Sequence, residues 1–321
     1  MKLAIIPAMA LMALSFTAGA VSITSPDGDF RLNVDVNAQG EPCYSLSFKG
    51  RPVVTDSRLG IVGAEAKFDK GFSIEASDTT SVDRTWTPVW GEYGEIRDHF
   101  NELAVTFVKP DPEIKMTVRF RLFDDGLGFR YELPLQPNVN YFAVDRELTE
   151  FNFTDNHGMF VIPGDYDTDE YLFSETDFSG VADAMKKYRG RHTESQAIER
   201  GVTVQTPMLL KTKDNKPLYI SLHEAALVGY PAMSLDVDTA RNAMSAHLTP
   251  DRLGVAAYLQ LPFSTPWRTM IVSDDARDIL ASQLVLNLNE PSKIEDTSWI
   301  KPMKFVGVWW EMFTGRQKTW A

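Results

Sequence analysis

The 321-residue sequence predicts a mainly β protein built as an antiparallel sandwich. Apolar and polar residues alternate through most of the stretch from Val21 to Trp267, which is the pattern of strands with one buried face. Clusters of Gly, Asn and Asp separate these runs, and helical patterns do not intervene between them. Aromatic residues make up 11% of the chain, with seven Trp and nineteen Phe. This favours a β-rich core, or surfaces that stack on flat sugar rings.

Three hairpins follow in order along this stretch. The first joins the alternation at 30–36 to that at 44–48 across the turn at 37–40. The second turns at Asp124-Asp-Gly126 and the third around Lys213-Asp-Asn-Lys216. A more polar stretch between the last two is expected to hold a short helix. The predicted hairpins cover residues 30–48, 116–133 and 209–222, and the predicted helix covers 181–188.

The N-terminus indicates the compartment. Lys2 precedes an almost wholly apolar run from Leu3 to Phe16, and small residues then lead to Ala20. This is the pattern of a secretory signal peptide cleaved after Ala20. The apolar run is shorter than the ~20 residues that a membrane-spanning helix needs. We therefore expect an exported, periplasmic protein with no membrane insertion.

Charge and cysteine content exclude several function classes. The 44 acidic residues exceed the 32 Lys and Arg and give a formal charge of −12. Nucleic acids are bound by clustered positive charge, so a nucleic-acid partner is excluded. The single cysteine, Cys43, excludes an intramolecular disulfide and a thiolate zinc site. It is expected to be an inert thiol, because no basic residue stands near it in the sequence.

The pattern changes near Ser273, where the alternation ends. Linker-like residues reach Lys301, and a continuous apolar run then extends from Lys304 to Trp310. Such a run predicts a strand buried on both faces, as in parallel sheets. The expected organisation is a signal peptide at 1–20, a β-sandwich at 21–270, a connecting segment at 271–300 and the incomplete start of a second domain at 301–321.

The densest acidic run is the segment from Asp165 to Glu170, which holds four carboxylates. Hard oxygen ligands suit Ca²⁺, which takes about six to eight of them. The run lacks the Gly and Glu that complete an EF-hand loop. The spacing alone therefore favours a solvated acidic turn, with a metal site as the alternative.

Other polar and aromatic groups are interpreted as structural. Trp86 and Trp90 are expected to be core residues at strand ends rather than a platform for sugar rings. His223-Glu224 is interpreted as the hydrogen-bonded end of a strand rather than a ligand-binding pair. Four carboxylates with the spacing of a charged face are expected to face water: Glu92, Glu95, Asp98 and Glu102.

Short motifs spread over the whole mature chain carry a resemblance to a known family. Among them are Trp86-x-Pro-Val-Trp-Gly-Glu92, Asp125-Gly-Leu-Gly-Phe-Arg-Tyr131, Ile162-Pro-Gly-Asp-Tyr-Asp-Thr168, Thr265-Pro-Trp-Arg-Thr269 and Trp309-Trp-Glu-Met312. Together and in this order they resemble glycoside hydrolase family 97, most closely its α-glucosidases of bacterial starch utilisation.

The resemblance implies a galactose-mutarotase-like β-supersandwich followed by a (β/α)₈ barrel. Residues 304–310 would form the first barrel strand, and a whole barrel takes ~250 residues. The family's catalytic carboxylates come from later barrel strands, so the resemblance assigns no catalytic residue to this chain. We therefore expect the 321 residues to be inactive on their own.

The resemblance also implies site residues. Glu170 would supply one carboxylate to a Ca²⁺ beside the catalytic centre. The resemblance therefore favours a metal site at the acidic run, whereas the spacing alone favours a solvated turn. Trp309 and the segment His192-Thr193-Glu194 would contact the sugar. A monomer or a weak dimer is expected.

The expected function is hydrolysis of α-glucosidic bonds in maltooligosaccharides with inversion. Other members of the family act on α-galactosides with retention, which gives the first alternative. A non-catalytic carbohydrate-binding or scaffolding sandwich is the second. The coding sequence beyond Ala321 would distinguish the enzyme from the scaffold.

Overall fold

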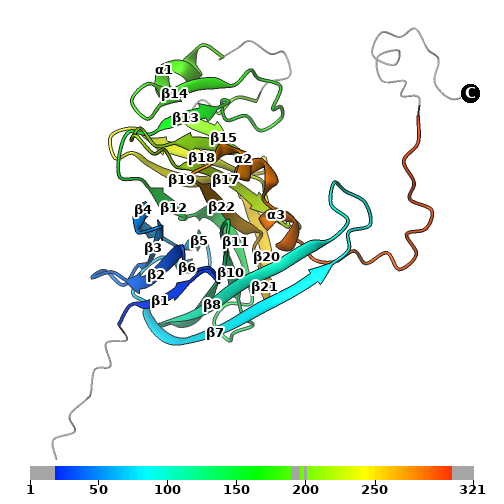
Figure 1. Cartoon of the computed structure of the whole chain (residues 1–321). Coiled ribbons are helices and arrows are strands. Elements are labelled where there is room, and N and C mark those ends of the chain that lie inside the picture. Colours follow the sequence, from blue (N-terminus) through cyan, green and yellow to red (C-terminus); the bar gives the residue numbers. More distant parts are fainter. Residues whose placement is uncertain (1–18, 189–195, 199–200, 306–321) are drawn as a thin grey trace, which may run out of the picture.

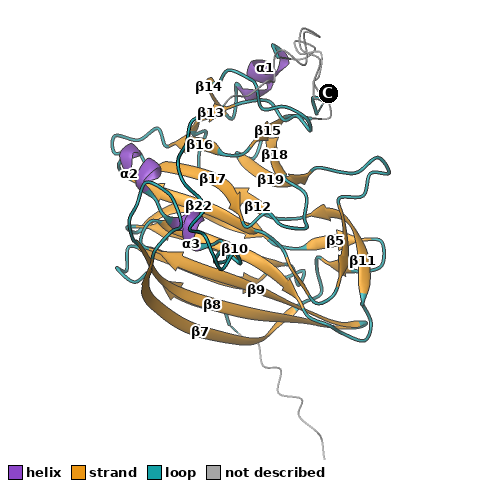
Figure 2. Ribbon diagram, turned by 90° about the vertical axis from the view of Figure 1, so that its right-hand side faces the viewer, coloured by secondary structure: helices purple, strands orange, loops and turns teal. Residues whose placement is uncertain are grey.

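The computed structural model describes residues 19–188, 196–198 and 201–305. Antiparallel sheets form the body of this part of the protein (Figure 1, Figure 2). This confirms the mainly antiparallel β fold that the alternation predicts. Short helices occur at three places in the described residues: α1 (Val181–Lys186), α2 (Ala276–Ala281) and α3 (Leu284–Asn287).

The strands form three sheets, and within each sheet neighbouring strands are hydrogen-bonded in the following order. The first contains β1 (Val21–Thr24), β2 (Phe30–Val36), β3 (Pro42–Phe48), β4 (Arg51–Arg58), β12 (Glu150–Asn152), β19 (Ala243–Leu248), β18 (Met233–Asp238) and β15 (Thr203–Gln205). The second contains β14 (Ser174–Asp177), β13 (Gly158–Val161), β16 (Met208–Lys211), β17 (Tyr219–Ala225), β22 (Trp267–Ser273), β10 (Gly126–Leu133), β9 (Glu113–Phe123), β8 (Ile96–Pro110) and β7 (Ser73–Trp86), with β21 (Phe263–Ser264) beside β10. The third contains β20 (Ala257–Gln260), β11 (Tyr141–Glu147), β5 (Ile61–Gly63) and β6 (Lys67–Phe68).

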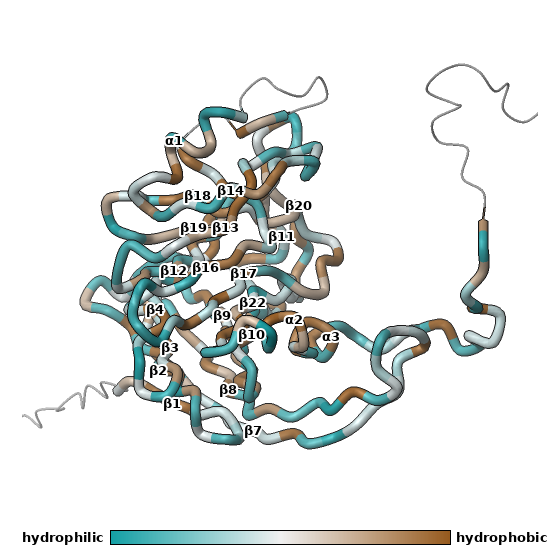
Figure 3. The backbone as a smooth tube through the Cα atoms, turned by 45° about the horizontal axis from the view of Figure 1, so that its top comes forward, coloured by the Kyte–Doolittle hydropathy of each residue, from teal (hydrophilic) through white to brown (hydrophobic). Residues whose placement is uncertain are grey.

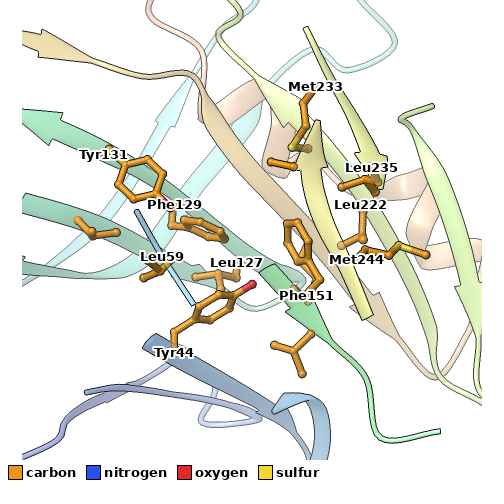
Figure 4. Close-up of a cluster of buried hydrophobic side chains, with 14 of the residues drawn as sticks. Tyr44, Leu59, Leu127, Phe129, Tyr131, Phe151, Leu222, Met233, Leu235 and Met244 are labelled. Atoms are coloured by element: carbon orange, nitrogen blue, oxygen red, sulfur yellow. The ribbon is translucent and has the colours of Figure 1, made fainter. Parts of the chain in front are cut away.

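Aromatic side chains from the first two sheets meet in the core. Figure 4 shows Tyr44 of β3, Phe129 of β10 and Phe151 of β12 gathered in one cluster. The ring centroids of Tyr44 and Phe129 are 5.1 Å apart, and those of Phe129 and Phe151 are 6.4 Å apart. Burying a side chain of this size stabilises the fold by roughly 1.5–3 kcal/mol. The Tyr44 hydroxyl keeps a partner by donating to the backbone oxygen of Glu150 at 3.0 Å.

The three predicted hairpins and the predicted helix are confirmed. Phe30 pairs with Phe48, Phe123 with Gly126 and Met208 with Leu222. Gly126 has φ +158°, and a Cβ on it would lie 2.2 Å from the Met270 backbone oxygen of neighbouring β22. The turn that ends β9 therefore requires glycine at this position.

A long hairpin, formed by β7 and β8, overturns two expectations. Its end extends beyond the sandwich (Figure 1), and Trp90 near the tip is 54% exposed rather than in the core. Asp98 and Glu102 were expected to face water, but they are only 1% and 8% exposed. The reason is ion pairing across neighbouring strands. Asp98 pairs with Arg84 of β7, and Glu102 pairs with Arg119 and Arg121 of β9.

Residues after the last strand pack back onto the second sheet. Leu284 and Leu288 join a small apolar cluster with Phe100, Phe123 and Trp267. The Asp275 side chain caps α2 by accepting from the backbone N–H of Arg277. Residues 292–305 carry no regular secondary structure. The barrel strand expected at 304–310 lies mostly outside the described residues.

Candidate functional site

The loop between β13 and β14 carries the acidic run. Its first residues pair with two other segments: the Gly164 N–H donates to the Thr203 backbone oxygen at 2.7 Å, and the Ile198 N–H donates to the Gly164 oxygen at 3.0 Å. A Cβ on Gly164 would lie 2.7 Å from Cγ2 of Thr203, so the close approach needs glycine. The start of this loop is therefore fixed on both sides.

Asp165 organises the turn that precedes Glu170. Its Oδ1 accepts from the backbone N–H groups of Asp167 at 2.9 Å, Thr168 at 3.2 Å and Gln196 at 3.1 Å. Its Oδ2 accepts from the Tyr171 hydroxyl at 2.7 Å. The residue is only 8% exposed. Its carboxylate is engaged in holding the loop together, which makes it a structural group and not a free metal ligand.

Glu170 lies at the end of the acidic run and differs from Asp165 in its surroundings. It is exposed, and its backbone N–H donates to Oγ1 of Thr168 at 3.1 Å. The described part of the chain contains no cluster of three or more His, Cys, Asp or Glu side chains that could hold a metal ion. Glu170 can therefore offer one carboxylate to an ion, and the other ligands would have to come from elsewhere.

The described residues on either side of the expected sugar-contacting segment are bonded to this loop. His192, Thr193 and Glu194 lie outside the described residues, as does Trp309. On one flank the Tyr188 hydroxyl donates to the Leu172 backbone oxygen at 2.8 Å.

On the other flank, the Gln196 backbone oxygen accepts from the N–H of Tyr166 at 3.2 Å, and Ala197 forms a bridge with Asp165. The chain on both sides of residues 189–195 is thus tied to the loop that carries Glu170.

A series of hydrogen-bonded polar side chains also anchors the loop to the first sheet. The Tyr166 hydroxyl lies 2.7 Å from Nε2 of His247, and the two rings stack with centroids 5.8 Å apart. Nδ1 of His247 lies 3.1 Å from the Asp236 carboxylate, which also accepts from Oγ1 of Thr203 at 2.6 Å. Burial, reinforced by Asp236, raises the pKa of Tyr166. The sequence gives no signal for this arrangement, because Tyr166 and His247 are 81 positions apart.

A buried ion-pair network occupies the interior of the sandwich. Arg268 is fully buried; its Nη2 lies 2.6 Å from Glu147, and its Nη1 lies 2.6 Å from Glu224. Glu224 also accepts from the Met233 backbone N–H at 3.1 Å, as expected for a hydrogen-bonded strand end. Burial raises the pKa of Glu224, and the Arg268 charge opposes this shift. The network is sealed from solvent, so its role is structural.

A protein-family model and several solved structures match this chain. The family model described as the glycosyl-hydrolase 97 N-terminal domain matches residues 23–291. A glycoside hydrolase family 97 enzyme from Pseudoalteromonas sp. strain K8, solved in complex with acarbose, is 37% identical with a TM-score of 0.80. The match covers 92% of this chain and 42% of that enzyme. A variant of the same enzyme in complex with panose is 36% identical, with a TM-score of 0.79 and the same coverage.

More distant relatives are also similar. The retaining α-galactosidase of Bacteroides thetaiotaomicron is 24% identical over 301 residues, covering 90% of this chain and 44% of that protein. The probable retaining α-galactosidase of Streptomyces bingchenggensis is 25% identical over 283 residues, covering 87% of this chain and 39% of its own length. The chain thus spans less than half the length of the relatives that it matches.

Proposed function

The chain belongs to glycoside hydrolase family 97, and from this we propose that it is the N-terminal sandwich of an exported α-glucosidase that trims maltooligosaccharides. The observation that carries the proposal is the similarity to the Pseudoalteromonas enzyme, which was solved with panose and acarbose. Panose is an oligosaccharide of α-linked glucose. Identity to that enzyme is 36–37%, against 24–25% to the curated α-galactosidases.

Glu170 is proposed as the contribution of the sandwich to a calcium site. Its exposed carboxylate is a hard oxygen donor of the kind that Ca²⁺ prefers. The hydrogen bonds of Asp165 fix the turn before it, so the donor projects from an ordered base. The remaining ligands are proposed to come from the part of the enzyme that the relatives possess beyond the matched region. Calcium bound there would supply positive charge beside the sugar hydroxyls.

The reaction class is proposed to be hydrolysis with inversion. One carboxylic acid would protonate the leaving oxygen while a carboxylate activates water. Both groups are assigned to the barrel, and the contribution of this chain is to bind and orient. His192, Thr193, Glu194 and Trp309 are proposed to contact the sugar ring.

Export to the periplasm is proposed from the signal-peptide pattern that ends at Ala20. Among the described residues, no helix has the length and apolar character needed to cross a membrane. We also propose that the enzyme is a monomer or a weak dimer.

The test is to express the complete coding sequence that contains these 321 residues and to assay matched nitrophenyl glycosides. We expect turnover of the α-glucoside and release of β-glucose, seen by proton NMR during the reaction. Preferential turnover of the α-galactoside, with the α-anomer as product, would instead support the alternative in which the protein is a retaining α-galactosidase. That alternative takes its support from the names of the two curated relatives.

A further inference from the structure

The edge strand β15 supports the loop that carries Glu170. β15 is hydrogen-bonded to β18 within the first sheet, and its Val204 also forms a bridge with Pro163 at the start of the loop. Figure 1 and Figure 3 both show β13, which leads into the loop, close to β18 and β19. The loop is therefore attached to the end of the first sheet through β15.

Gln205, the last residue of β15, holds both ends of the acidic turn. Its Nε2 donates to the backbone oxygen of Pro163 at 3.1 Å and to that of Thr168 at 2.8 Å. Its backbone N–H also donates to the Ile162 oxygen at 3.2 Å. A side-chain amide has two N–H donors, and both are used here on the loop. One residue therefore fixes the chain before and after the turn.

The contact at Thr168 extends to Glu170. The Thr168 N–H donates to Oδ1 of Asp165 at 3.2 Å, and its Oγ1 accepts from the Glu170 N–H at 3.1 Å. Gln205 holds the backbone oxygen of the same threonine. The backbone of Glu170 is thus connected to β15 through a single intervening residue, while its side chain is exposed.

A separate anchor holds the middle of the turn. Nδ1 of His247 lies 3.1 Å from both carboxylate oxygens of Asp236, so it carries the proton of the neutral ring. Nε2 of His247 then accepts from the Tyr166 hydroxyl at 2.7 Å. This anchor acts on residue 166 and does not involve Gln205. Loss of the Gln205 amide would therefore leave the loop attached and release mainly the end that carries Glu170.

We propose that Gln205 is a positioning residue for calcium, which holds Thr168 so that the Glu170 carboxylate is presented from a fixed backbone. The inference rests on the proposed calcium role of Glu170. Groups that orient a metal ligand without touching the ion commonly change metal affinity when they are removed. A ligand that is already fixed loses less conformational freedom on binding, so the intact amide should favour calcium.

The test is Gln205→Met in the protein expressed from the complete coding sequence, because Met keeps the length of the side chain and removes both donors. In EDTA, peptides covering residues 163–171 should exchange their backbone hydrogens faster, as measured by mass spectrometry. The rise in Tm that added Ca²⁺ produces should require about two- to tenfold more calcium, the factor expected for lost hydrogen bonds. A purely structural role would lower the Tm in EDTA and leave this calcium dependence unchanged. Gln205→Asn, whose amide is one methylene shorter, should shift both readouts in the same direction.

Gln260→Met is the matched control. Nε2 of Gln260 in β20 also donates two hydrogen bonds, to the backbone oxygen and Oδ1 of Asn140 at 3.1 and 2.8 Å. Its loss should change neither the exchange of the loop nor the calcium dependence.

Two failures are distinguishable. The positioning role alone is overturned if Glu170→Gln reduces the calcium response while Gln205→Met leaves it, or the exchange of the loop, unchanged. It is also overturned if Gln260→Met has the same effect as Gln205→Met. If Glu170→Gln leaves the calcium response intact, the calcium role of Glu170 is rejected and this inference with it.

Discussion

At the scale of single residues, the most consequential group is the guanidinium of Arg268. It is fully buried and makes ion pairs with two carboxylates, those of Glu147 and Glu224. Thr149 and Tyr230 donate further hydrogen bonds to Glu147 at 2.7 and 3.2 Å. Burial alone would lower the pKa of Arg268, but the two carboxylates outweigh it and raise the pKa. The arginine therefore stays charged, and it joins β22 to β11 and β17.

Replacing Arg268 by Met should destabilise the sandwich by about 3–5 kcal/mol, because two buried carboxylates would lose their partner. Urea unfolding followed by circular dichroism measures the difference. Arg277→Met is the control: its side chain is 88% exposed, and its loss should cost less than about 0.5 kcal/mol. Equal stability of the two variants would show that the buried network contributes little.

Cys43 provides a second prediction at this scale. Burial, with smaller contributions from Asp56 and Asp35, raises the pKa of the Cys43 thiol to about 11. The thiolate is the reactive form, so the folded protein should hardly react with a disulfide reagent at neutral pH. The same protein in denaturant should react fully. Rapid reaction of the folded chain would contradict the burial of this thiol.

At the scale of elements, the loop between β13 and β14 depends on Asp165. Its carboxylate accepts from three backbone N–H groups and one tyrosine hydroxyl. Asp167, two residues on, is exposed and contributes its backbone to the same turn. The two acidic residues therefore have different roles despite their proximity.

Asp165→Ala should destabilise the fold by about 1–3 kcal/mol, since it leaves buried donors without an acceptor. It should also speed proteolytic cleavage within residues 162–173. Asp167→Ala should change stability by less than about 0.5 kcal/mol. Matched urea titrations and limited digestion of both variants make the comparison. A larger effect from Asp167→Ala would mean that the roles of the two residues are reversed.

The strands also show which parts of the fold could be predicted from the sequence. The three hairpins were predictable because alternation and turn residues are local signals. The course of β7 was not, because this edge strand is mostly exposed and does not alternate in burial. The burial of Asp98 and Glu102 could not be predicted, because carboxylates are expected to face solvent unless their arginine partners are known. Those partners lie on paired strands, 14 positions away for Arg84 and 17 for Arg119.

The candidate site was predictable only in part. The acidic run marked the loop, but spacing could not separate the structural Asp165 from the exposed Glu170. Hydrogen bonds from Gln196 and Tyr171 make that distinction, and they depend on how the loop folds. The contact between Tyr166 and His247 depends on the pairing of distant strands and has no local signal. The resemblance to family 97 was needed to single out Glu170.

At the scale of the whole molecule, the sandwich supplies only part of the proposed active centre. The chain spans 42% of the similar Pseudoalteromonas enzyme and 44% of the Bacteroides relative. One exposed carboxylate is far fewer than the ~6 oxygen ligands that calcium needs. The ion, if bound as proposed, therefore links the sandwich to the remainder of the enzyme.

The 321-residue chain alone should accordingly show no turnover of nitrophenyl α-glucoside or maltose. It should also bind Ca²⁺ only weakly. Glycosidase assays and calorimetric calcium titration of the purified chain measure these two properties. Clear turnover would place catalytic groups within these residues, and micromolar calcium affinity would reveal a complete site that the proposal does not include.

The most direct test of the shared site is a calcium titration of Glu170→Gln in the protein expressed from the complete coding sequence, with Asp167→Asn as control. Glu170→Gln should lower kcat and reduce the rise in Tm that added Ca²⁺ produces, because the substitution removes the negative charge that favours a hard cation. Its Tm in EDTA should match that of the unmodified enzyme. Asp167→Asn should behave like the unmodified enzyme throughout. Equal losses in both variants, or no loss in Glu170→Gln, would contradict the assignment of the calcium ligand to Glu170.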